Sequence, residues 1–291
     1  MIYRPSTIKR KRRTKAQIDQ LDNQICEALA QHHPQSIRHV FYLMTNPRLP
    51  EPVEKTDNGY RHVQDRLTKL RRAGRIPYHW ISDASRRGYH VHTYRDAADF
   101  VRSVAGLYRA DLWAQSQYYV EVWTESRSLA SVIQDDCEEL AVSLYPAGGF
   151  SSISLAYQAA DSINDIVEVT GKQPVVLFIG DYDPAGVLID ASLQKEMQKH
   201  LHCDLHFQRL GITPEQIREY DLPTKPRKAS DKRSQHITET VEGEAMPVEI
   251  MRRLLRDTIE SYLPPDALRV AKVAEQAERM DLISMARGLE L

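Results

Sequence analysis

The sequence contains little cysteine and no long apolar run. Its three cysteines, Cys26, Cys137 and Cys203, lie far apart in a chain of 291 residues. An odd number of widely separated cysteines argues against a disulfide framework and against a zinc site. No apolar stretch approaches the roughly 18 residues of a membrane-spanning helix, and no signal-peptide core follows the basic start. We therefore expect an intracellular protein with no membrane partner.

The sequence also lacks the motif Gly-x-x-x-x-Gly-Lys-Ser/Thr. Its absence excludes ATP hydrolysis through a P-loop. The composition is otherwise ordinary for a soluble globular protein, with 42% hydrophobic and 27% charged residues, which is enough apolar material to build a core. A chain of this length exceeds the usual size of a single domain, so we expect one large domain or two modest ones.

The net charge of −1 conceals two oppositely charged parts of the chain. Residues 1–116 hold 21 lysines and arginines against 11 acidic residues, whereas residues 117–291 hold 18 against 29. The first part therefore carries a charge of +10 and the second a charge of −11. A basic part suggests a polyanionic partner, and an acidic part suits metal binding or simple solubility.

The chain begins with a basic arm, because residues 4–15 contain no acidic residue. Such a block of like charges repels itself until it meets phosphates. We interpret residues 1–14 as an arm that contacts phosphates, with a localisation signal or a solvated tail as the alternatives. The residues of this arm that we expect to contact DNA are Lys9, Arg10, Lys11, Arg12 and Arg13.

Three segments with apolar residues at helical spacing follow the arm. They predict helices over residues 15–30, 37–44 and 60–73. A strand is expected over residues 75–81 and a turn over residues 83–88. Three short helices followed by a small hairpin are the layout of a winged-helix domain of the CAP type, a layout that other small helical domains share.

We place this DNA-binding domain at residues 15–112, and a helix over residues 95–115 links it to the rest of the chain. The third helix, residues 60–73, is the expected recognition helix, and its polar side is basic. The residues of this helix that we expect to contact DNA are Arg66, Lys69, Arg71 and Arg72.

Arg38 and Tyr42 stand four residues apart on the second predicted helix, hence on one face of it. Two interpretations of Tyr42 remain open. In the first, it is a core aromatic residue whose hydroxyl touches an arginine. In the second, it is a nucleophile. Because a phenol has a pKa of about 10, a nucleophilic tyrosine needs a nearby cation, which Arg38 is placed to supply.

An apolar run at residues 175–179 leads directly into Gly-Asp-Tyr-Asp-Pro-Ala-Gly at residues 180–186. The run is typical of a strand buried on both faces of a sheet. Pro184 cannot continue the ladder, so Asp181 and Asp183 leave the strand at its carboxyl end, where ligands bind in open α/β sheets. Two such carboxylates can lean toward one hard cation such as Mg²⁺. Capping of the next helix is their alternative role.

Glu125 holds the same position at the end of another predicted strand, residues 118–124. Glu121 is the competing candidate, but it lies in mid-strand, where its side chain would point into or along the sheet. Predicted strands and helices alternate from residue 118 to residue 209, which indicates a doubly wound α/β domain. We place this domain at residues 116–291, with C-terminal helices over residues 247–262 and 266–288.

Glu125, Gly148-Gly149 and Asp181-x-Asp183-Pro-x-Gly186 follow three successive predicted strands. This pattern resembles the Toprim domain, the catalytic fold of type IA, II and VI topoisomerases, of primases and of OLD-family nucleases. The upstream Arg38-x-x-Phe41-Tyr42 narrows the resemblance to the A subunit of topoisomerase VI and the related meiotic double-strand-break transesterase. In size the chain is most similar to the stand-alone Mini-A proteins.

The resemblance implies Mg²⁺-dependent double-strand cleavage of DNA, in which Tyr42 attacks and becomes linked to a 5′ phosphate. Arg38 would be the supporting cation. Glu125, Asp181 and Asp183 would hold Mg²⁺, for which Mn²⁺ can substitute. The resemblance also implies a homodimer on double-stranded DNA, a cytoplasmic or nucleoid-associated location, and a separate ATPase subunit of the B type as a partner.

Two other classes of function stay open. A Toprim nuclease would hydrolyse DNA with metal-activated water, and Tyr42 would then be structural. A DNA-binding module with a degenerate site is the third reading, against which the acidic triad argues. Glu242 and Glu244 form a further acidic pair that could flank the metal, but we expect a solvated turn there.

Overall fold

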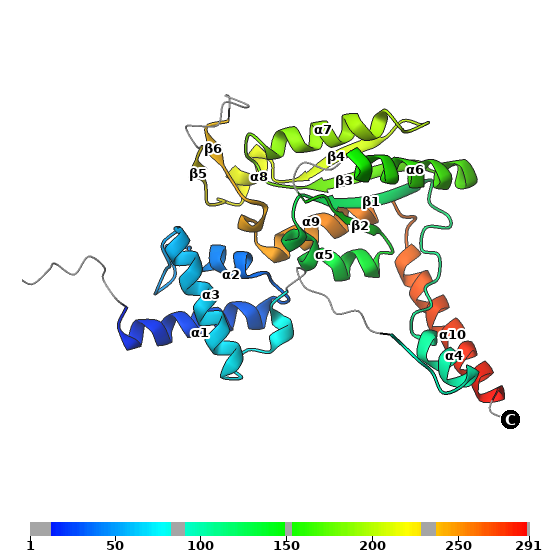
Figure 1. Cartoon of the computed structure of the whole chain (residues 1–291), viewed down its shortest axis with the longest axis horizontal. Helices are drawn as coiled ribbons and strands as arrows, with labels where there is room; N and C mark the ends of the chain where they lie inside the picture. Colours follow the sequence, from blue (N-terminus) through cyan, green and yellow to red (C-terminus); the bar gives the residue numbers. More distant parts are fainter. Residues whose placement is uncertain (1–12, 83–90, 149–152, 228–236, 290–291) are drawn as a thin grey trace, which may run out of the picture. The chain divides into compact units, whose positions relative to one another are not determined.

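The computed structural model of the chain describes residues 13–82, 91–148, 153–227 and 237–289. It divides between Ser82 and Asp83 into two compact units. The first unit contains three α-helices, and the second contains a parallel β-sheet with its helices (Figure 1). The α/β class predicted from the sequence is therefore confirmed.

The helices of the first unit begin where the sequence provides capping side chains. α1 (Lys15–Gln31), α2 (Ile37–Met44) and α3 (Asp57–Arg72) follow Thr14, Ser36 and Thr56, whose hydroxyl oxygens each accept an N–H of the first turn. The three predicted helices are confirmed. Apolar residues of all three are buried together; they are Leu21, Ile25, Leu29, Val40, Met44, Val63, Leu67 and Leu70.

The strand predicted over residues 75–81 is wrong. A 3-10 turn, η1 (Tyr78–Trp80), follows Pro77, and Ile81 forms a single β-bridge with Gln35. Pro77 has no N–H to donate to a ladder, which weakens any extended pairing here. The predicted turn at residues 83–88 lies outside the described residues, so the winged-helix assignment stays a prediction.

Four strands of the second unit form one parallel sheet in the order β2-β1-β3-β4. They are β1 (Tyr118–Thr124), β2 (Ser143–Pro146), β3 (Gln173–Ile179) and β4 (His206–Gly211). The helices that connect them are α5 (Arg127–Glu139), α6 (Ile153–Thr170) and α7 (Gly186–Gln198). The chain passes from β1 to β2 on one side, and then returns to place β3 on the other side of β1. All seven elements occur in the predicted order.

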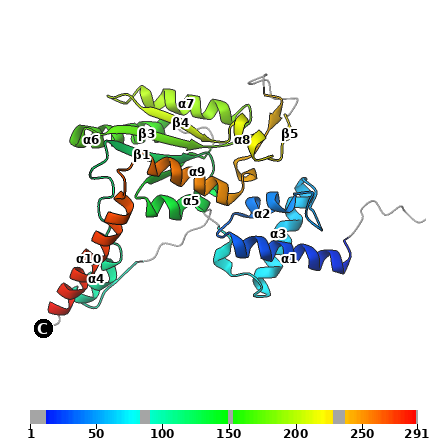
Figure 2. The ribbon, with the colours of Figure 1, turned by 180° about the vertical axis from the view of Figure 1, so that it is seen from behind.

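Helices cover both faces of this sheet. Figures 1 and 2 show α6 and α7 on one face, and α5 with α9 (Val248–Glu260) on the other. On the first face, Trp123 and Phe178 pack against Ala160 of α6 and Leu193 of α7. Coverage on both faces explains why β3 is buried along its whole length after Gln173.

Shorter elements complete the second unit. α8 (Pro214–Glu219) follows β4, and β5 (Lys225–Pro226) pairs in antiparallel fashion with β6 (Glu239–Thr240). A 3-10 turn, η2 (Gly243–Ala245), then leads into α9. The helices predicted near residues 247–262 and 266–288 are confirmed as α9 and α10 (Ala267–Gly288).

α4 (Ala97–Ala105) is shorter than the helix predicted over residues 95–115. It packs beside α10, and the guanidinium of Arg279 in α10 donates to the carbonyl of Tyr108 at 2.8 Å. This segment was predicted to belong to the domain of residues 15–112, whereas the structure groups it with the second unit. Contact with α10, which lies at the far end of the chain, decides its place. Throughout the described residues, no helix has the length and apolarity that crossing a membrane requires.

Arg66 of α3 and Asp22 of α1 provide a test of the first unit. The guanidinium donates to both carboxylate oxygens, at 2.7 and 2.6 Å, and the side chains are 15% and 5% exposed. Arg66→Met leaves this carboxylate buried without its main partner, so we expect a loss of about 3 kcal/mol in the free energy of unfolding. The free energy of unfolding is measured in urea, and hydrogen exchange of the amides of α1, α2 and α3 monitors the first unit.

Arg72→Met is the matched control, because Arg72 is exposed on the same helix. We expect its effect to stay within about 0.5 kcal/mol. Equal effects of the two substitutions would contradict the structural role of Arg66.

Candidate metal centre at the sheet edge

The carboxyl ends of β1 and β3 lie side by side. The two strands are adjacent and parallel, with Thr124 opposite Ile179, and the N–H of Glu125 donates to the carbonyl of Ile179 at 2.9 Å. The order of the strands reverses here, since β2 follows β1 on one side and β3 lies on the other. Such a switch point is where open α/β sheets bind ligands. Glu125 and Asp181 therefore leave the sheet at the position that favours a binding site.

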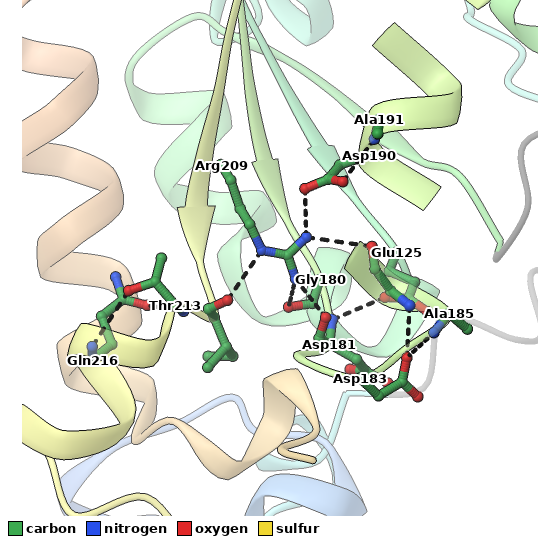
Figure 3. Close-up of polar contacts among 12 residues, drawn as sticks. Glu125, Gly180, Asp181, Asp183, Ala185, Asp190, Ala191, Arg209, Thr213 and Gln216 are labelled. Carbon is green, nitrogen blue, oxygen red and sulfur yellow. Dashed lines mark hydrogen bonds and ion pairs between the residues drawn. The ribbon is translucent and has the colours of Figure 1, made fainter. Parts of the chain in front are cut away.

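Glu125 contacts the segment after β3 directly. Its Oε2 accepts the backbone N–H of Asp181 at 2.8 Å (Figure 3). Gly180 makes this approach possible, because a Cβ at this residue would lie 2.8 Å from Glu125 Oε2 and 2.7 Å from the Phe178 ring. Any other residue at position 180 would displace the carboxylate. The glycine before the first aspartate thus has a steric role in the site.

Asp183 points to the start of α7. Its Oδ1 accepts the N–H of Ala185 at 2.8 Å and the N–H of Gly186 at 2.6 Å (Figure 3). Both N–H groups lie at the start of α7, where the N–H groups of a first turn have no partner within the helix.

A third segment, around η2, contacts the residues that follow β3. The N–H of Gly243 donates to Asp181 Oδ1 at 2.8 Å, and Val241 forms a β-bridge with Tyr182. Glu244 is only 5% exposed, and its Oε1 accepts from the hydroxyl of Ser126 at 3.4 Å. The solvated turn expected at Glu244 is therefore wrong. The sequence showed Glu244 only as one of two neighbouring acidic residues, and the structure shows that it is buried beside Ser126.

Burial and nearby negative charges raise the pKa of two carboxyl groups in this site. Burial, together with the charges of Glu125 and Glu244, raises the pKa of Asp181 to about 8. Burial also raises the pKa of Glu125, against the hydrogen bond from the Asp181 N–H, which lowers it. Like charges that approach this closely outside bulk water favour either a proton or a cation between them.

The donor set fits a divalent cation. Carboxylate oxygens are the ligands that Mg²⁺ prefers, and Glu125, Asp181 and Asp183 each accept backbone N–H groups through one of their two carboxylate oxygens. The structure brings Glu125 and Asp181 together and holds Asp183 at the start of α7. Within the described ranges, no three acidic, histidine or cysteine side chains converge closely enough to enclose an ion.

Glu121, the competing candidate in β1, lies inside the protein as expected. It is fully buried, and its carboxylate accepts from the Tyr119 hydroxyl at 2.9 Å and from Trp123 Nε1 at 2.8 Å. Both donors belong to the same strand and the same face of the sheet. Glu121 is thus a structural residue of the core.

Tyr42 of α2 lies in the core of the first unit. It is 5% exposed, and its ring packs beside that of Phe41. Lys55 Nζ lies 5.2 Å from the centre of the Tyr42 ring, whereas the Arg38 guanidinium lies 5.9 Å from the centre of the Tyr60 ring. Lys55 was not predicted from the sequence, because its approach to Tyr42 depends on the loop between α2 and α3, which no periodicity predicts.

The basic residues expected to contact DNA have varied surroundings. Arg66 is bound to Asp22 inside the first unit, so the structure gives it a protein partner in place of an open position. Lys69 pairs with Asp65 at 2.7 Å on the surface, and Arg72 is exposed. The Arg71 guanidinium lies 5.7 Å from the Tyr78 ring centre, and Arg13 donates to Glu51 at 2.7 Å. Residues 9–12 of the arm lie outside the described residues.

The pKa of Asp181 predicts how pH affects stability. Its carboxyl has a pKa of about 3.9 in an unfolded chain and of about 8 in the fold. The folded state therefore binds the proton more tightly, and this contribution to stability is lost as pH rises from about 4 to about 8. Asp181→Asn removes the ionisable group. We expect the metal-free variant to unfold at a higher temperature than the wild type at pH 8, and at a similar temperature at pH 4.

Thermal unfolding in a chelator from pH 4 to pH 9 measures this difference. Asp165→Asn, at an exposed position on α6, is the control for loss of a carboxylate elsewhere. Parallel curves for Asp181→Asn and wild type would show that Asp181 titrates normally.

Comparisons with protein-family models, with curated proteins and with solved structures give no match to this chain.

Proposed function

We propose that this protein is a Mg²⁺-dependent DNA-cleaving transesterase of the topoisomerase VI A type. The observation that carries the proposal is the contact between Glu125 and Asp181 at the switch point of a parallel sheet, with the Asp-x-Asp-Pro-x-Gly segment beside it. In this proposal the second unit is a Toprim domain and the first a winged-helix domain. Double-stranded DNA is the substrate.

Tyr42 is the proposed nucleophile. Its hydroxyl oxygen forms a bond to a backbone phosphorus, and the bond to the 3′ oxygen breaks, so that the 3′ oxygen leaves with a proton and the 5′ phosphate stays on the tyrosine. One phosphodiester bond, to the tyrosine oxygen, replaces another, to the 3′ oxygen, so the cut needs no external energy source. Arg38 and Lys55 are the cations near this part of α2 that would favour the phenolate and the phosphate.

Glu125, Asp181 and Asp183 are the residues that would hold the metal. A bound Mg²⁺ supplies positive charge to phosphate oxygens of the substrate. The backbone N–H groups of Asp181, Gly243, Ala185 and Gly186 keep the three side chains in place. A raised pKa at Asp181 also means that metal binding releases a proton below about pH 8.

Cleavage of both strands needs two copies of this chemistry. A two-fold axis through the DNA would relate them, so we propose a homodimer on its substrate. An ATPase subunit of the B type is a further proposed partner, because this chain has no P-loop.

Removal of the carboxylates tests the metal centre. We expect Glu125→Gln and Asp181→Asn each to lower Mg²⁺-dependent DNA cleavage at least about 100-fold, because each removes a charged ligand of the cation. Calorimetric titration with Mn²⁺ should show a parallel loss of binding. Asp165→Asn is the control and should behave as the wild type. Full Mn²⁺ binding without Glu125 and Asp181 would place the metal elsewhere.

A covalent protein–DNA adduct tests the nucleophile. Labelled duplex DNA is incubated with the protein and Mg²⁺ or Mn²⁺, denatured with detergent, and analysed on a gel before and after protease treatment. A label at the 3′ end of the cut strand lies on the downstream fragment, so it should migrate with the protein and return to the DNA position after proteolysis. A 5′-end label lies on the upstream fragment and should stay free of protein. Tyr42→Phe should abolish the adduct, whereas Tyr60→Phe, a tyrosine of the same unit, should keep it.

Hydrolysis by a Toprim nuclease is the second candidate function. The burial of Tyr42 favours it, because a tyrosine that is 5% exposed fits a structural role in the core. A nuclease would leave free 5′-phosphate ends, and Tyr42→Phe would cut as well as the wild type. The same gel therefore separates the two functions.

A further inference from the structure

Arg209 of β4 uses its entire guanidinium within the protein. Nε donates to the carbonyl of Ile212 at 3.0 Å. Nη1 donates to Asp190 Oδ2 at 2.6 Å and to the carbonyl of Gly186 at 3.4 Å. Nη2 donates to the carbonyl of Gly180 at 3.1 Å and to that of Asp181 (Figure 3).

These five contacts match the five N–H groups of a guanidinium. No donor is left over for a phosphate, so Arg209 is not available as a DNA contact in this arrangement. Lysine could not replace the pattern, since its ammonium has three donors and no planar fork. The Arg209 side chain is 17% exposed, and its guanidinium lies 5.7 Å from the centre of the Phe178 ring.

The carbonyls that Arg209 binds belong to the segment that carries the aspartates. Gly180 and Asp181 follow β3, and Gly186 opens α7, so one side chain connects both ends of the turn. Asp190, one turn further along α7, balances the charge of Arg209 at 2.6 Å. The peptide between Gly180 and Asp181 is therefore held on its carbonyl side by Arg209 and on its N–H side by Glu125.

We propose that Arg209 is a positioning residue for the metal centre. It orients the turn at residues 180–186 so that the Asp181 N–H faces Glu125 and the Asp181 carboxylate faces Gly243. It also brings one positive charge near Glu125, which partly offsets the acidic surroundings. The role deepens the proposed function, since it rests on the metal site but not on the cleavage chemistry.

Calorimetric binding of Mn²⁺ to the full-length protein is the experiment. Arg209→Lys keeps the charge and loses the fork, and Asp190→Asn keeps the fork and loses the counter-charge. Loss of a group that orients metal ligands commonly weakens metal binding 10- to 100-fold, so we expect a dissociation constant raised at least about 10-fold by Arg209→Lys. Asp190→Asn should have a smaller effect in the same direction. Arg218→Lys, on the exposed face of α8, is the matched control.

Amide hydrogen exchange of residues 180–186 accompanies the titration and shows whether the turn has loosened. Wild-type affinity in Arg209→Lys, with unchanged exchange, would overturn the proposal. A wild-type protein that binds no Mn²⁺ would defeat the metal centre itself. In that case exchange alone decides the role of Arg209: faster exchange confined to residues 180–186 supports positioning, and unchanged exchange rejects it.

Discussion

Two carboxylates of like charge, Glu125 and Asp181, lie together where two parallel strands end, and much of the second unit is arranged around them. Taking such groups out of water raises their pKa unless donors or cations compensate. Backbone N–H groups of Asp181 and Gly243 supply part of the compensation. Gly180 leaves the space in which Glu125 reaches its partner. The arrangement costs stability in the absence of a cation, which is typical of a binding site and unusual for a structural contact.

Arg209 shows how an open sheet keeps such a site in shape. The site lies on connections, and connections lack the regular ladder that fixes a strand. β4 adds order from the neighbouring strand, because its arginine binds the carbonyls that follow β3. The two carboxylates accept from backbone N–H groups of the turn after β3 and of the turn before α9, and Arg209 of β4 donates to carbonyls of the first of these turns.

In the basic first unit, some positively charged side chains pair within the protein and others stay exposed. A sequence with many arginines on one helix suggests a surface for phosphates, but a helix also has to pack. Arg66 takes part in packing, with a carboxylate 44 residues earlier in the chain, whereas Arg72 remains exposed. Tyr42 is similar, since it packs in the core of the first unit. Net charge therefore suggests the class of binding partner, whereas burial decides which side chains are accessible to that partner.

The sequence alone determined the succession of strands and helices from residue 118 to residue 209 and the position of Glu125, Asp181 and Asp183 at strand ends. These features depend on local periodicity and on breakers such as Pro184 and Gly180, which act over a few residues. It could not determine that Arg66 pairs with Asp22, that Lys55 approaches Tyr42, that Glu244 is buried, or that Arg209 binds the turn after β3. Residues 75–81, predicted to be a strand, contain a 3-10 turn after Pro77 and form only one bridge, between Ile81 and Gln35. Tertiary structure decided all of these, since each depends on which distant segments the sheet order and the helix packing bring into contact.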